Sequence, residues 1–112
     1  MTTRTTDAGS VVSLGDDDLE SVVGVDGPAL VEFHAEWCGA CQRMKPHLET
    51  IAAETDATVL TVDIESHLET AIEFGAQSTP TFVLFVNGQP VKQLRGAQTE
   101  QSLRDLVGRY NS

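Results

Sequence analysis

The 112-residue chain has two cysteines, Cys38 and Cys41, separated by only two residues. The apolar pattern predicts that a strand ends before them and that a helix begins at Cys38 or Gly39. Cys38 would then lie where unpaired backbone N–H groups and the helix dipole favour an anion, which lowers the pKa of a thiol. Cys41 would follow one turn later, on the inward face. A solvent-exposed thiolate that attacks, beside a shielded thiol that resolves the intermediate, is the arrangement used in thiol–disulfide exchange.

Other uses of two cysteines fit the sequence less well. A disulfide framework would need more cysteines. Structural zinc normally has four ligands, and His34, His47 and His67 form no H-x₃₋₅-H pair. We therefore expect no metal. The alternative from another functional class is a binding module in which Cys38 and Cys41 coordinate metal together with ligands of a partner.

Glu32 interrupts an apolar run, residues 29–35, that predicts a buried strand. A carboxylate buried there loses its hydration, so its pKa should rise, and a bland packing role would be costly. One interpretation is a general base that deprotonates Cys41, directly or through water. The alternative is that Glu32 reaches the surface or pairs with a basic side chain.

Apolar periodicity and turn residues predict the elements that position these groups. Strands are expected at about 11–14, 29–35, 57–64, 80–86 and 91–94, with helices after Gly15, from Cys38 or Gly39, near Leu68 and after Thr99. Pro46 lies inside the long helix and should kink it. The buried helical stripes are predicted to be Cys41, Met44, Leu48, Ile51 and Ala52, then Leu103, Leu106, Val107 and Tyr110. This order predicts an α/β domain with one sheet, parallel across its crossovers and antiparallel at an Asn-Gly hairpin.

Length and charge limit the classes of function. The chain has the size of one domain, which we place at residues 10–112 after a disordered tail at 1–9. No apolar run is long enough to cross a bilayer and no secretory leader is visible, so we expect a cytoplasmic protein with no membrane partner. Seven Lys and Arg against seventeen Asp and Glu give a net charge of −10, which argues against nucleic-acid binding. The acidity is typical of a well-hydrated surface, or of adaptation to high salt.

Several motifs together resemble the thioredoxin family. They are Phe33-His-Ala-Glu-Trp-Cys-Gly-Ala-Cys41, Pro46 in the next helix, Thr79-Pro80-Thr81, Phe85-Val-Asn-Gly88 and Gly96. The similarity covers about residues 11–110. It implies a thioredoxin-like α/β fold, with a central mixed sheet flanked by helices on both faces. It also implies a protein-disulfide reductase that works through a reversible Cys38–Cys41 disulfide.

The resemblance implies roles for particular residues. Cys38 would be the nucleophile, Cys41 the resolving cysteine, and Glu32 would stand where the family carries a buried acid, usually aspartate. Pro80 would be a cis-proline facing the disulfide, and the Thr79 backbone would pair with an extended substrate segment. An apolar rim of Trp37, Gly96 and Pro80 would receive the target protein. The full set of expected substrate contacts is Trp37, Gly39, Ala40, Thr79, Pro80 and Gly96.

The chain departs from the family pattern at three positions. Ala40 replaces the usual proline between the cysteines, His34 stands where tryptophan is frequent, and Thr61 replaces a lysine often paired with the buried acid. Glu32 is therefore expected to lack that countercharge, so its pKa should be higher than in members that carry the lysine.

The same resemblance implies partners. They are disulfide-containing target proteins and a flavoprotein reductase that recharges the dithiol from NADPH. The domain shows no Gly-rich dinucleotide motif, so we expect no bound cofactor. A monomer is the simplest expectation. A disulfide oxidant or isomerase is the alternative within the same fold, which an oxidising compartment would favour.

Overall fold

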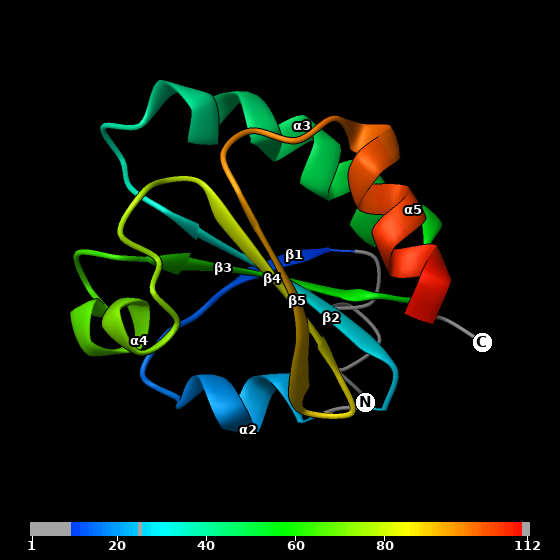
Figure 1. The fold of residues 1–112 in the computed structure, drawn as a ribbon, viewed down its shortest axis with the longest axis horizontal. Helices are drawn as coiled ribbons and strands as arrows, with labels where there is room; N and C mark the ends of the chain where they lie inside the picture. Colours follow the sequence, from blue (N-terminus) through cyan, green and yellow to red (C-terminus); the bar gives the residue numbers. More distant parts are fainter. Residues whose placement is uncertain (1–9, 25, 111–112) are drawn as a thin grey trace.

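The computed structural model describes residues 10–24 and 26–110. The predicted tail at 1–9 and the last two residues of the predicted domain lie outside this part. Five strands form one sheet in the order β1-β3-β2-β4-β5, with helices on both sides (Figure 1). In chain order the elements are β1 (Val11–Ser13), α2 (Leu19–Val23), β2 (Pro28–His34), α3 (Gly39–Glu54), β3 (Thr58–Asp63), α4 (Leu68–Glu73), β4 (Thr81–Val86), β5 (Gln89–Arg95) and α5 (Glu100–Tyr110).

The sheet is mixed, as expected, but one predicted crossover is wrong. β3 pairs in parallel with β1 and β2, whereas β4 runs antiparallel to β2 as well as to β5. The six residues of α4 give about 9 Å of helix, while the six residues of β3 extend about 20 Å. So short a helix cannot return the chain along the sheet, and β4 begins near the end where β3 stops. Thr81 consequently pairs with Phe33, at the end of β2 that leads to the cysteines.

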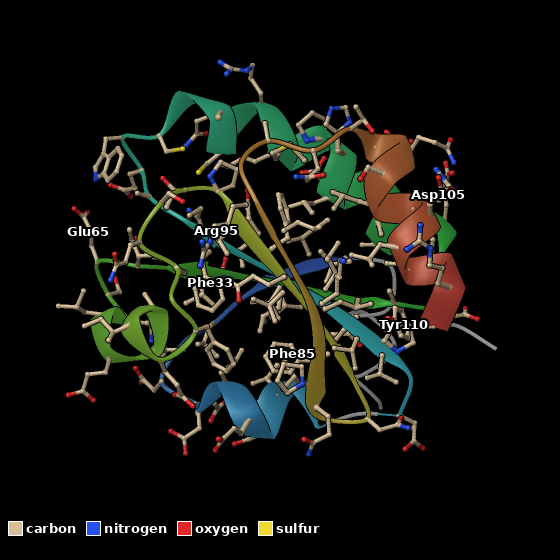
Figure 2. All side chains as sticks on the ribbon, in the orientation of Figure 1. Phe33, Glu65, Phe85, Arg95, Asp105 and Tyr110 are labelled. Carbon is tan, nitrogen blue, oxygen red and sulfur yellow. The ribbon has the colours of Figure 1, made fainter. Side chains whose placement is uncertain are left out.

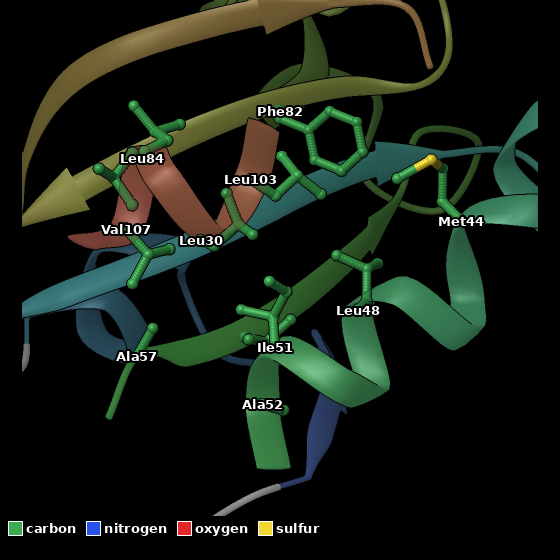
Figure 3. Packing of buried hydrophobic residues seen from close by; sticks show 12 residues of the cluster. Leu30, Met44, Leu48, Ile51, Ala52, Ala57, Phe82, Leu84, Leu103 and Val107 are labelled. Atoms are coloured by element: carbon green, nitrogen blue, oxygen red, sulfur yellow. The ribbon is translucent and has the colours of Figure 1, made fainter. Parts of the chain in front are cut away.

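One face of the sheet packs against α3 and α5 (Figure 3). Met44, Leu48 and Ile51 of α3 lie over Leu30 of β2, and α5 adds Leu103 to the same cluster. These α3 positions follow the predicted stripe, with Pro46 inside the helix. The stripe of α5 is confirmed except at its end: Tyr110 is 37% exposed because the last turn extends past the sheet-facing cluster.

The opposite face packs against α2 and α4. Figure 2 shows Phe33 and Phe85 on this side, and both rings contact Phe74, at centroid distances of 5.9 and 5.5 Å. α4 contributes Ala71 to this core, whereas Leu68 and Ile72 point outward and are 61% and 59% exposed. With only six residues, α4 covers a small part of the sheet, so its other apolar side chains have no core to enter.

Local sequence explains where these elements start and stop. At the β4–β5 hairpin, Asn87 and Gly88 have φ values of 52° and 85°, which these two residue types tolerate best. Thr99 accepts a hydrogen bond from the Ser102 N–H at 3.0 Å and so caps the start of α5. Both were predicted from the sequence. No helix in the described part of the chain is long and apolar enough to span a membrane.

Candidate active site

Cys38 and Cys41 lie at the junction of β2 and α3. Cys38 is the N-cap of α3, with an extended backbone, and its Sγ accepts a hydrogen bond from the Cys41 N–H at 3.2 Å. Its own N–H donates to the Ala35 carbonyl at 3.2 Å, which closes the turn between strand and helix. The predicted helix start and the one-turn separation of the two sulfurs are therefore confirmed.

Cys38 is less accessible than the sequence predicts. Its exposed fraction is 7% and that of Cys41 is 2%, and both pack in a small cluster with Ala35. The expectation of a well-exposed nucleophile is wrong because the N-cap side chain turns back over the helix start to accept the hydrogen bond. The neighbouring residues Glu36, Trp37 and Gly39 are exposed.

The two thiols differ strongly in acidity. Burial alone would raise the pKa of Cys38, but hydrogen bonds outweigh it and lower this pKa. They come from the thiol of Cys41, the side chain of Thr79, and the backbone of Cys41 and Ala40. Burial, the hydrogen bond to Cys38 and the charge of Glu32 raise the pKa of Cys41 to about 12. The asymmetry between the two thiols thus combines the hydrogen bonds that lower the pKa of Cys38 with the burial that is the largest cause of the raised pKa of Cys41.

Glu32 lies on β2 behind the cysteines and is 2% exposed. Its register partners are Thr61 on β3 and Phe82 on β4. Among the described residues, its Oε2 atom has no hydrogen-bond partner. Burial, followed by the charge of Cys38, raises the pKa of Glu32 to about 8, in the predicted direction. The interpretation in which Glu32 reaches the surface is excluded.

Lys45 acts on this carboxyl from α3, which the sequence analysis missed. Its positive charge lowers the pKa of Glu32, although less than burial raises it. Thr61 supplies no countercharge to Glu32, and Lys45 offsets the effect of burial only in part. Lys45 lies four residues after Cys41, hence on the same side of the helix, and this spacing was the available signal.

Thr79, Pro80 and Gly96 come together on the other side of the thiols. The Thr79–Pro80 peptide bond is cis, as the resemblance implied, and the Gly96 N–H donates to the Pro80 carbonyl at 2.8 Å. Pro80 is buried, so its ring adds little to the expected apolar rim. Hydrogen bonding by the Thr79 side chain also lowers the pKa of both cysteine thiols, whereas sequence reasoning assigned Thr79 only a backbone role toward the substrate.

The other expected substrate contacts lie around the thiols. They are Trp37, Gly39, Ala40 and Gly96. Trp37 is 68% exposed, and its Nε1 donates to Glu65 at 3.2 Å. Gly39 is exposed, while Ala40 and Gly96 are half-buried. Most of the Trp37 side chain is therefore available to a partner.

His34 is half-buried at the end of β2, and burial lowers its pKa. Residues 10–24 and 26–110 contain no group of three or more His, Cys, Asp and Glu side chains placed to hold a metal ion.

Comparison with known proteins identifies the chemistry of this cysteine pair. The family model for thioredoxin matches residues 10–109. A thioredoxin of Mycobacterium tuberculosis is 43% identical over 96 residues, covering 80% of this chain and 83% of that protein. A bifunctional thioredoxin reductase/thioredoxin of Mycobacterium leprae is 44% identical over 88 residues, covering 76% of this chain and 19% of that protein.

A solved structure supports the same assignment. A thioredoxin point mutant from Halobacterium salinarum superimposes with a TM-score of 0.89 at 34% identity, covering 95% of both chains. The match therefore includes the whole sheet and the loops that hold the cysteines. The chain belongs to the thioredoxin family and is a thiol–disulfide oxidoreductase of the protein-disulfide reductase type.

Proposed function

We propose that Cys38 is the nucleophile, Cys41 the resolving cysteine and Glu32 the base that activates Cys41. The observation that carries this assignment is the opposite perturbation of the two thiols: hydrogen bonds lower the pKa of Cys38, while burial raises that of Cys41 to about 12. Cys38 is then the more readily ionised thiol, and Cys41 is the one that needs a base.

In the first step the Cys38 thiolate attacks one sulfur of a target disulfide. A bond forms between Cys38 Sγ and that sulfur, the target S–S bond breaks, and the other target sulfur leaves as a thiolate that takes a proton from solvent. Thr79 and the exposed rim of Trp37, Gly39, Ala40 and Gly96 hold the target chain against the dithiol.

In the second step Glu32 takes the proton from Cys41, and the Cys41 thiolate attacks Cys38 Sγ. The Cys38–Cys41 disulfide forms, the second target sulfur leaves, and two electrons have passed to the target. The charge of Cys38 raises the pKa of Glu32. Formation of the mixed disulfide removes that charge, which lowers the pKa of Glu32 and favours its carboxylate form when a base is required.

The oxidised pair must then be recharged. The Mycobacterium leprae relative is a thioredoxin reductase/thioredoxin in one chain, which supports a flavoprotein reductase as electron donor, drawing on NADPH. We place this cycle in the cytoplasm and the protein in it as a monomer without a bound cofactor. Residues 10–112 form the working domain.

Reduction of insulin disulfides tests the assignment. Cys38→Ser should abolish turnover, while Cys41→Ser should accumulate a covalent adduct with the target that mass spectrometry detects. Ser21→Ala, at an exposed position of α2, is the control and should retain turnover. Full activity of Cys38→Ser would refute the mechanism.

A further inference from the structure

Three polar side chains cross the sheet in one row from the buried carboxyl to the surface. Glu32 on β2 pairs with Thr61 on β3, and Thr61 pairs with Ser13 on β1. Leu30 and Val59, two residues before Glu32 and Thr61, belong to the α3-side cluster, so by strand alternation the polar side chains share that face. Exposure increases along the row: Glu32 is buried, Thr61 is half-buried and Ser13 is exposed.

The outer two members of the row are already hydrogen-bonded. The Oγ atom of Ser13 and the Oγ1 atom of Thr61 are 3.3 Å apart, and either can be the donor. A hydroxyl both donates and accepts, so this pair can pass a proton in either direction. At the inner end, the Oε2 atom of Glu32 is buried without a partner among the described residues. Buried polar atoms of this kind are commonly bridged to a neighbour by an ordered water.

We propose that Thr61 and Ser13 form a proton relay that connects Glu32 to solvent through one bridging water. The inference deepens the proposed function, on which it rests: as Glu32 takes a proton from Cys41, a proton must pass on to solvent in the same step, so the relay affects the rate at which Cys41 attacks. Within the described chain, Cys38 at the N-cap of α3 and Lys45 in α3 act on Glu32, and Glu32 acts on Cys41 in the same helix. The relay runs from the carboxyl of Glu32 along the row of side chains, across β3 to the edge strand β1.

The proton balance is simple. The Sγ–H bond of Cys41 breaks and an O–H bond forms on Glu32. In concert, the carboxyl proton passes to the water, a water proton to Thr61, the Thr61 hydroxyl proton to Ser13, and the Ser13 proton to solvent. Each hydroxyl regains the proton that it gives, so only Cys41 loses a proton and only solvent gains one. No electrons move in this step.

A single-turnover reaction with an aromatic disulfide reagent separates the relay from the chemistry before it. Attack by Cys38 releases one coloured aryl thiolate, and attack by Cys41 on the mixed disulfide releases the second. Thr61→Val keeps the shape of the side chain and removes the hydroxyl. We expect it to leave the first release unchanged and to slow the second by about tenfold, less than the loss of a base itself would.

Matched variants distinguish a relay from a structural role. Thr61→Ser restores a hydroxyl and should restore most of the second rate. Thr58→Val makes the same chemical change on β3 but on the opposite face, and should leave both rates unchanged. In the unmodified protein, the second rate measured in mixtures of H₂O and D₂O should depend on deuterium content along a curve, because more than one proton moves. Because this measurement needs no variant, it still tests the relay if Thr61→Val does not fold.

Two results would overturn the relay. One is a folded Thr61→Val protein whose second release is as fast as that of the unmodified protein. The other is a linear dependence on deuterium content, which indicates a single moving proton. Failure of the proposed function would give a different result: a Cys38→Ser protein would still release the first aryl thiolate.

Discussion

Replacing Glu32 by glutamine should remove most of the pH dependence of stability between about pH 4.5 and pH 8. The pKa of Glu32 is about 8 in the folded chain, against an ordinary value of 4.5. Between these values the unfolded chain has released the proton and the folded chain still holds it. Because the folded state binds more protons, the free energy of unfolding falls as pH rises through this window. Below pH 4.5 both states are protonated and the penalty is absent.

The expected size follows from the same two values. At about 1.4 kcal/mol for each pH unit, the interval from 4.5 to about 8 amounts to about 5 kcal/mol. Glu32 is 2% exposed, so solvent screening does little to reduce this figure. A loss of this size is a large part of the 5–15 kcal/mol that stabilises a typical domain.

Urea unfolding of the reduced protein, followed by circular dichroism from pH 4 to pH 8, measures the effect. The glutamine amide adds a constant offset because it too is buried. As pH rises, the free energy of unfolding should fall for the unmodified protein and stay nearly constant for Glu32→Gln, so the variant should become more stable relative to the unmodified protein. Glu49→Gln, at an exposed position of α3, should follow the unmodified protein. A difference for Glu32→Gln that stays constant from pH 5 to pH 8 would refute a buried carboxyl with a raised pKa.

Three further predictions address the thiols, the rim and the core. Cys41→Ala removes a hydrogen bond that lowers the pKa of Cys38, so the pH midpoint for alkylation of Cys38 should move upward; an unchanged midpoint contradicts the assigned cause. Trp37 is 68% exposed, so Trp37→Ala should change stability by no more than about 0.5 kcal/mol while raising KM for a protein disulfide more than for a small one. Equal effects on both substrates would exclude docking on this ring. Leu48→Ala, at a site 1% exposed, should cost about 2–5 kcal/mol in urea unfolding, whereas Leu68→Ala, at a site 61% exposed, should cost at most about 0.5 kcal/mol. Similar losses would contradict the packing described.

Local patterns predict most of the fold. The stripe of α3, the Asn87-Gly88 hairpin and the cap at Thr99 each depend on residues close together in the chain, so their types and spacing carry the information. The direction of β4 depends instead on how far α4 can carry the chain relative to the length of β3. Apolar periodicity does not contain that comparison, and the predicted parallel pairing is wrong as a result.

The site shows the same division. The Cys38–Cys41 spacing and the apolar run around Glu32 locate the chemistry from sequence alone. The contributions of Thr79 and Lys45 come from tertiary contacts, because β4 and α3 bring them to the thiols and to Glu32. The burial of Cys38 depends on the direction of one side chain at the helix start, which residue type does not fix.

The two edges of the sheet restrict how a partner can bind. β1, at one edge, has three residues. β5, at the other, is exposed along most of its length, but Pro90 lacks a backbone donor and Lys92 places a charge there. Neither edge offers a long row of free backbone groups, so strand addition along the sides, the first step of sheet-to-sheet aggregation, is disfavoured. A disulfide-containing target can thus bind at the loops that hold the thiols without extending the sheet.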